Sequence, residues 1–138
     1  MRGETPKVER ITADPDWYEP YKISLGIRVG DLLFISGQVS VTEEGELVGA
    51  GDFDAQAEQA FANLSKVLES GGSSLADVVK VTIFLTDMDN FGKIVELRER
   101  YFTPPYPADT LVEVSSLARP EWLNAELLIE IEAIAVIR

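Results

Sequence analysis

Hydrophobic and polar residues alternate in a stretch near the start of the chain. Ile23, Leu25, Ile27 and Val29 are separated by polar or small residues, and a period of two is typical of a half-buried strand. Gly30-Asp31 then predicts a tight hairpin turn, followed by a returning strand over residues 32–41. Glutamates around a glycine predict a second turn at residues 43–46.

Helical spacing replaces the alternation after residue 52. Apolar residues between Phe53 and Leu68 recur every three or four positions, Asp52 can cap the helix, and Gly71-Gly72 ends it. A second helix is expected to begin at Asp89 or Asn90 and to stop before Pro104-Pro105.

Three further strands complete the prediction, at residues 78–86, 110–117 and 127–137. The order β-β-α-β-α-β-β, without a linker or a repeat, predicts one α+β domain over residues 1–138.

Two helices can cover only one face of such a sheet. In the last strand the odd-numbered residues from 127 to 137 are all apolar, so we assign this face to the helices. The even-numbered face mixes Glu130 and Glu132 with Leu128, Ile134 and Val136, and the strand at residues 32–41 pairs Phe34, Ser36, Gln38 and Ser40 on a similar face. A face of this kind usually meets another subunit, so we expect an oligomer that buries it.

Composition excludes several classes of function. The 138 residues include no cysteine and no histidine, which excludes a thiolate zinc site and Ser-His-Asp catalysis; we expect no bound metal. A net charge of −12 disfavours nucleic acid as a partner. No signal-like apolar segment opens the sequence, and residues 127–137 are too short to cross a bilayer, so we expect a cytoplasmic protein without a membrane partner.

Several motifs, in order along residues 20 to 136, resemble the Rid (reactive intermediate deaminase, YjgF-like) family. They are Phe34-Ile-Ser-Gly-Gln38, Gly51-Asp-Phe-Asp-Ala-Gln-Ala-Glu-Gln-Ala60 with Asn63-Leu64, Asp77-Val-Val-Lys-Val-Thr-Ile-Phe-Leu-Thr-Asp-Met88, Pro107-Ala108, Val112-Glu-Val114 and Glu130-Ile-Glu-Ala-Ile-Ala135. The resemblance implies a chorismate-mutase-like fold, a homotrimer with an inner barrel, and small-molecule clefts between subunits. It also implies hydrolysis of imines or enamines without a cofactor.

The family's site residues transfer to positions that match its motifs. The resemblance implies that Glu130 positions the attacking water and that Tyr21, Ser36 and Gly37 line the cleft. Read without the family, Glu130 and Glu132 are an ion-paired surface face, with Lys80 or Arg28 as partners; Ser36-Gly37 is equally a strand bulge, and Tyr21 packs against Pro20. Val95 and Leu111 are assigned to the cleft as well.

One departure from the family pattern affects substrate choice. Asp109 stands where relatives have the arginine that binds the substrate carboxylate, Val95 replaces an asparagine, and Arg98 a common tyrosine. An acid at position 109 would repel anionic 2-imino acids unless one acid is protonated, or unless Arg98 or Arg119 supplies the anchor instead. On the simplest interpretation Asp109 only caps a turn.

Three functions are therefore compared. The first is an imine or enamine deaminase for a small metabolite other than a standard 2-imino acid. The second is a catalytically silent Rid-fold trimer that binds or regulates through a small molecule. The third, translation initiation inhibitor or endoribonuclease L-PSP, comes from older family labels and is disfavoured by the acidic charge and the absence of histidine.

Overall fold

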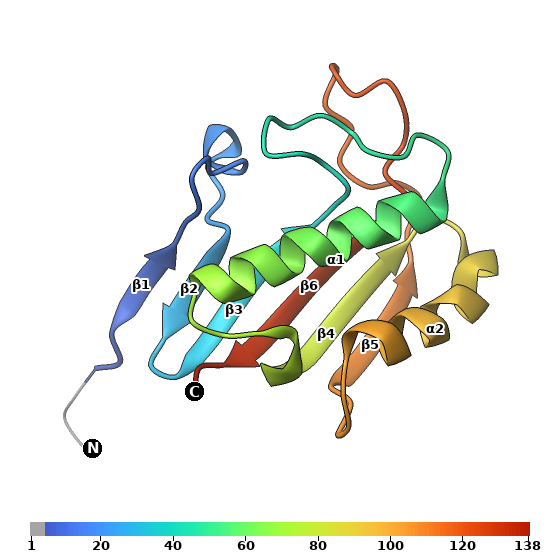
Figure 1. The fold of residues 1–138 in the computed structure, drawn as a ribbon. Helices are drawn as coiled ribbons and strands as arrows, with labels where there is room; N and C mark the ends of the chain where they lie inside the picture. Colours follow the sequence, from blue (N-terminus) through green and yellow to red (C-terminus); the bar gives the residue numbers. More distant parts are fainter. Residues whose placement is uncertain (1–4) are drawn as a thin grey trace.

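The computed structural model describes residues 5–138 as one six-stranded sheet with two helices (Figure 1). Its elements are β1 (Val8–Ile11), β2 (Gly26–Val29), β3 (Leu32–Gln38), α1 (Phe53–Ser70), β4 (Val78–Leu85), α2 (Phe91–Tyr101), β5 (Ala108–Glu113) and β6 (Ile129–Val136). The strand order is β1-β2-β3-β6-β4-β5, and only β4 and β5 run parallel. The predicted α+β fold and its element order are confirmed, with one strand added at the N-terminal end.

The sequence pattern missed β1. This strand is polar, with the sequence Val-Glu-Arg-Ile, and it pairs along one side only, with β2. Only Ile11 of the four is buried. An edge strand of this kind has no apolar period from which it could be predicted.

The strand expected at residues 23–29 begins only at Gly26, so this prediction is wrong at its first three residues. A short 3-10 helix, η1 (Glu19–Tyr21), precedes it, and Lys22 takes a left-handed conformation with φ 64°. The chain therefore turns at Lys22, and Ile23 remains 45% exposed instead of joining the apolar face.

A bulge interrupts β3 between Ile35 and Gln38. Ile35 lies opposite Ala133 on β6, and Gln38 lies opposite Ile131, so Ser36 and Gly37 together face one residue of β6 and β3 has one extra residue here. The bulge moves Gln38 to the core face, where it is fully buried, while Phe34 stays 42% exposed. Ser40 is fully buried too. The expectation that Gln38 and Ser40 share the face of Phe34 is therefore wrong.

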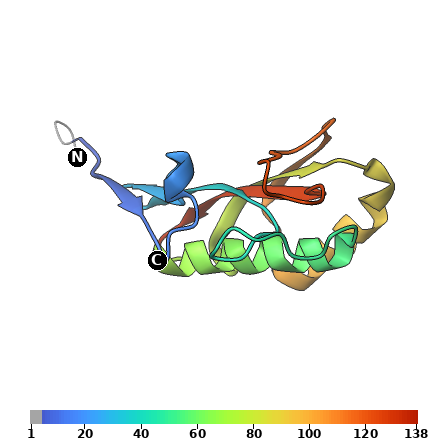
Figure 2. The same ribbon diagram turned by 90° about the horizontal axis from the view of Figure 1, so that it is seen from above.

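Helix α1 forms as its sequence predicts. The Asp52 carboxylate accepts a hydrogen bond from the Ala55 N–H, and the helix ends at Gly71. Its apolar stripe packs on β3 and β6, and α2 lies on the same side of the sheet (Figure 2). Phe61, Leu64 and neighbouring residues are fully buried there.

Two buried polar side chains of α1 hold irregular backbone in place. Asn63 donates to the carbonyls of Val39 and Val41, both at 2.9 Å. Gln56 donates to the Glu126 carbonyl at 3.0 Å and accepts from the Leu128 N–H at 2.8 Å. Because an unpaired backbone group is costly when buried, the Asn63 bonds stabilise the chain just after β3, and the Gln56 bonds fix the point where β6 begins, just before Glu130.

Strand β6 has the two faces that the alternation predicts. Ile129, Ile131, Ala133 and Ala135 are buried beneath the helices, whereas Glu130, Ile134 and Val136 are only partly covered on the opposite face. Figure 2 shows η1 and the loop 114–128 on that opposite side of the sheet.

Within residues 5–138, neither helix is long and apolar enough to cross a membrane.

Candidate functional site

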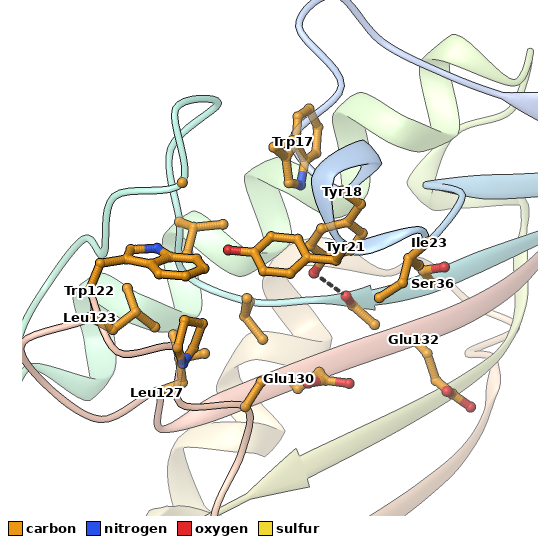
Figure 3. A pocket seen from close by; sticks show the side chains of 16 residues that line it. Trp17, Tyr18, Tyr21, Ile23, Ser36, Trp122, Leu123, Leu127, Glu130 and Glu132 are labelled. Atoms are coloured by element: carbon orange, nitrogen blue, oxygen red, sulfur yellow. Dashed lines mark hydrogen bonds between the residues drawn. The ribbon is translucent and has the colours of Figure 1, made fainter.

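A cavity of about 490 Å³ opens on the helix-free side of the sheet. We call it the Glu130 pocket. Four aromatic residues, Trp17, Tyr18, Tyr21 and Trp122, form much of its wall, together with Ser36, Gly37, Glu130, Glu132 and aliphatic residues of the loops (Figure 3). The pocket thus brings together four predicted site residues: Tyr21, Ser36, Gly37 and Glu130.

Glu130 is the central polar group of this pocket. Burial raises the pKa of its carboxyl group, and the negative charge of Glu132 raises it further. Neither Lys80 nor Arg28 pairs with the two glutamates: Lys80 bonds the Thr110 hydroxyl and Arg28 the Gly30 carbonyl. Within one chain these residues therefore form no ion pair with the two glutamates, and the described ion pairs include neither glutamate.

The β3 bulge shapes the pocket beside Glu130. A Cβ atom on Gly37 would overlap the Glu130 side chain, so glycine at this position lets the carboxylate keep its present conformation. The Tyr18 hydroxyl donates to the Gly37 carbonyl, shown as the dashed line in Figure 3. The pKa of Tyr18 is raised by burial and by the nearby charge of Glu130, so Tyr18 acts here as a neutral donor.

The Ser36 hydroxyl donates to the Ser24 carbonyl at 2.6 Å. The cleft and the bulge, left open as interpretations of Ser36-Gly37, thus coincide in the structure.

Aromatic rings form the outer part of the pocket. Tyr21 stacks on Trp122, with ring centroids 5.8 Å apart and planes 26° from parallel. Tyr21 is therefore packed against Trp122 of the loop 114–128 (Figure 3). Trp17 is 5% exposed, and its indole N–H is buried without an acceptor among the described residues.

A second cavity, of about 430 Å³, lies between α2 and β5. We call it the Asp109 pocket, lined by Val95, Arg98, Glu99, Phe102, Tyr106, Pro107 and Asp109. It shares no lining residue with the Glu130 pocket. Val95 and Asp109, both predicted as site residues, therefore lie apart from the other four within a single chain.

Asp109 is paired rather than free. Arg98 Nε donates to Asp109 Oδ2 at 2.9 Å and Arg98 Nη2 to Oδ1 at 3.0 Å, which is a bidentate pair. The side chains are 27% and 17% exposed. The expectation that Asp109 presents an uncompensated negative charge is thus wrong, because the last turn of α2 places a guanidinium beside it. The turn-cap interpretation is not needed to explain the residue.

The remaining sequence-derived residues lie outside these contacts. Leu111 packs against the core from β5 and lines neither pocket. Arg119 pairs with Glu126 at 3.6 Å instead of reaching Asp109. Trp122 lines the Glu130 pocket, although no sequence motif assigned it to the site. A tryptophan in a long loop between two strands was the available signal, because large aromatics in loops are common at binding sites.

The acidic residues offer no ready place for a metal. In the described part of the chain, no group of three or more acidic side chains is arranged to hold an ion.

Comparison with known proteins gives consistent results. The family model described as Endoribonuclease L-PSP matches residues 12–137. A RutC family protein of Pyrococcus horikoshii is 44% identical over 84% of this chain and 86% of its own. A Mus musculus protein named 2-iminobutanoate/2-iminopropanoate deaminase is 37% identical over 94% of this chain and 90% of its own.

Solved structures agree with the sequence matches. The crystal structure of YyfA, a protein of the Rid family from Yersinia pestis, superposes with a TM-score of 0.81 at 31% identity. It covers 95% of this chain and all of the other.

Proposed function

Because this chain belongs to the Rid (YjgF-like) family, whose model is described as Endoribonuclease L-PSP, we propose that it is a cofactor-free imine or enamine hydrolase. The observation that carries the proposal is Glu130, a partly buried carboxylate with a raised pKa and no ion-pair partner among the described residues, in a cavity of small-molecule size. Relatives named 2-iminobutanoate/2-iminopropanoate deaminase support the reaction class.

Glu130 would act as the general base. An ionised carboxylate whose pKa is raised takes a proton from water more readily than an ordinary one. The water oxygen then forms a bond to the imine carbon, and the proton that Glu130 took from water passes to the imine nitrogen. As this adduct collapses, its hydroxyl proton passes through Glu130 to the nitrogen and the carbon–nitrogen bond breaks, so the imine and water become a carbonyl compound and ammonia. The Tyr21 side chain lines the same pocket and would help to position the water or the adduct.

The substrate would be something other than a standard anionic 2-imino acid. Among the described residues that line the Glu130 pocket there is no lysine or arginine, and two are glutamates. Arg98 already gives two of its N–H groups to Asp109. A substrate carboxylate would therefore meet negative charge in one pocket and an occupied guanidinium in the other.

A homotrimer would join the two pockets. Tyr21, Ser36 and Glu130 lie in one cavity and Val95 and Asp109 in another, and contact between neighbouring subunits would bring the two groups to one cleft. The uncovered face with Phe34 and Ile134 would then be buried around the threefold axis. A monomeric mass in light scattering at micromolar concentration would contradict this.

The test is semicarbazide trapping of imines that an amino-acid oxidase generates, with neutral imines added to the panel. Purified protein should reduce trapping of at least one imine, and Glu130→Gln should lower that rate by about 10²–10⁴-fold. Glu69→Gln, an exposed position on α1, is the matched control and should keep the wild-type rate. No acceleration across the panel would contradict the proposal.

The second candidate is a silent trimer that binds a small metabolite. The Arg98–Asp109 pair favours this candidate, because Asp109 already binds the Arg98 guanidinium that could otherwise hold a substrate carboxylate. Saturable binding of an imine analogue without turnover would support this candidate over the first.

A further inference from the structure

We propose that the Glu130 pocket selects an organic cation: a protonated amine or iminium group attached to a flat, apolar body. This inference rests on the proposed function, because it names the substrate class of that same pocket. Three features of the pocket carry it: its charge, its aromatic wall, and its size.

The charge of the pocket is negative. Glu130 and Glu132 are its ionisable carboxylates, and no lysine or arginine lies among the described lining residues. Lys66, which lies 5.5 Å from the centroid of the Trp17 ring, pairs with Glu43. A cation on the ligand would give the partly buried Glu130 carboxylate the partner that it lacks in the described protein.

The wall of the pocket is aromatic. Tyr21 and Trp122 stack on one another, and Trp122 is 63% exposed although it is the largest apolar side chain of its loop. Tryptophan and tyrosine faces attract cations and stack on planar groups. A flat ligand can therefore lie against this pair while its nitrogen points towards Glu130 (Figure 3).

The size of the cavity supports a larger ligand than a four-carbon imino acid. Water occupies about 30 Å³ in the liquid, so 490 Å³ corresponds to roughly sixteen waters. A small imino acid would leave most of this volume empty, whereas a ring with a short amine-bearing chain would fill more of it.

The experiment is calorimetric titration of the full chain at neutral pH with three probes. Phenethylamine carries both a cation and a ring, 3-phenylpropanoate has the ring with an anion, and n-butylamine has the cation without a ring. Phenethylamine should bind at least tenfold more tightly than either of the others. Equal affinity for 3-phenylpropanoate would overturn the role of charge, and equal affinity for n-butylamine would overturn the role of the aromatic wall.

Two variants of Trp122 test the aromatic wall, and a third variant, at Phe91, is the control. Trp122→Ala should weaken phenethylamine binding about tenfold, and Trp122→Phe should restore most of it. Phe91→Ala removes a 52% exposed aromatic on α2, outside the pocket, and should change nothing. An unchanged affinity in Trp122→Ala would overturn the proposal.

Hydrolysis is measured separately by imine trapping. Turnover of small imines without preferential phenethylamine binding would refute this inference while leaving the proposed function intact. Preferential phenethylamine binding without turnover of any imine would support this inference and contradict the proposed function.

Discussion

The Glu130 pocket and the Asp109 pocket belong to one small chain, and each contains a partly buried carboxylate, yet their polar groups are satisfied to very different degrees. In the Asp109 pocket, both carboxylate oxygens accept from one guanidinium at 2.9 and 3.0 Å. In the Glu130 pocket, the carboxylate has no ion-pair partner among the described residues, and the Trp17 N–H has no acceptor.

This difference separates a structural charge from a reactive one. A bidentate pair holds both side chains in one geometry and cancels their charge, which favours stability and a fixed shape. An unpaired carboxylate under aromatic rings is costly to keep ionised, and that cost is what makes it basic. The two pockets therefore predict opposite responses to substitution.

Among substitutions that keep the Glu130 side chain, the largest effect is expected from Gly37→Ala. The added Cβ would overlap the Glu130 carboxylate and force it aside, and a misplacement of about 1 Å can lower a rate about 100-fold. Imine hydrolysis should fall by about that factor in the trapping assay.

Gly92→Ala is the matched control for this change. A Cβ at Gly92 meets nothing within 4 Å, so activity should be unchanged and the free energy of unfolding should rise by about 0.4–1 kcal/mol. A fully active Gly37→Ala protein would show that the position of Glu130 does not matter for the reaction.

A smaller effect is expected from Asp109→Asn. This change keeps the shape of residue 109 but weakens its hold on Arg98, which can then bind a substrate carboxylate. Hydrolysis of 2-iminobutanoate should rise about tenfold, equivalent to about 1.4 kcal/mol. Asp31→Asn, in the exposed β2–β3 turn, makes the same change in net charge and should have no effect. If both variants match the wild type, the Arg98–Asp109 pair does not restrict the substrate.

The pair should also be visible in stability. We expect Arg98→Met and Asp109→Asn to be coupled by about 1 kcal/mol in a double-mutant cycle measured by urea unfolding. The coupling energy is modest because the side chains of Arg98 and Asp109 are 27% and 17% exposed, so solvent screens part of the attraction. Additive effects of the two substitutions would contradict the bidentate geometry.

The smallest effect is expected from Glu132→Gln, in the pH profile. Glu132 raises the pKa of Glu130 less than burial does, so its removal should lower that pKa slightly. A base must be ionised to act, so the acidic limb of the rate profile should move to lower pH. Glu69→Gln should leave the limb in place, and a shift to higher pH in Glu132→Gln would reverse the assigned electrostatics.

Glu130→Gln should show the matching trend in stability. The folded state raises the pKa of Glu130 above its unfolded value, so the ionised group destabilises the fold as pH rises through this range. The amide variant should therefore be more stable than the wild type at neutral pH. The advantage should disappear in acid, below the unfolded pKa, where both states carry the proton. Urea unfolding at the two pH values measures this, and equal stability at both would argue that Glu130 is well solvated.

Local periodicity determined much of the fold. The helical stripe of α1, its Asp52 cap and the two faces of β6 follow from spacing alone, because helix and strand geometry repeat at fixed intervals. The same alternation placed Glu130 on the uncovered face of β6. By contrast β1 has no such period, and its strand forms only because β2 offers an edge to pair with.

The partners of the site residues were decided by tertiary structure. Spacing cannot show that the β3 bulge turns Gln38 inward, since one inserted position reverses every later face of a strand. Nor can it choose among partners for Asp109: Arg98 and Arg119 were equal candidates in the sequence, and only the approach of α2 to β5 selects Arg98. Trp122 and Tyr21 meet because two segments distant in sequence cover the same face of the sheet. Charge pairing and ring stacking depend on distances in space, and a sequence determines those only through the whole fold.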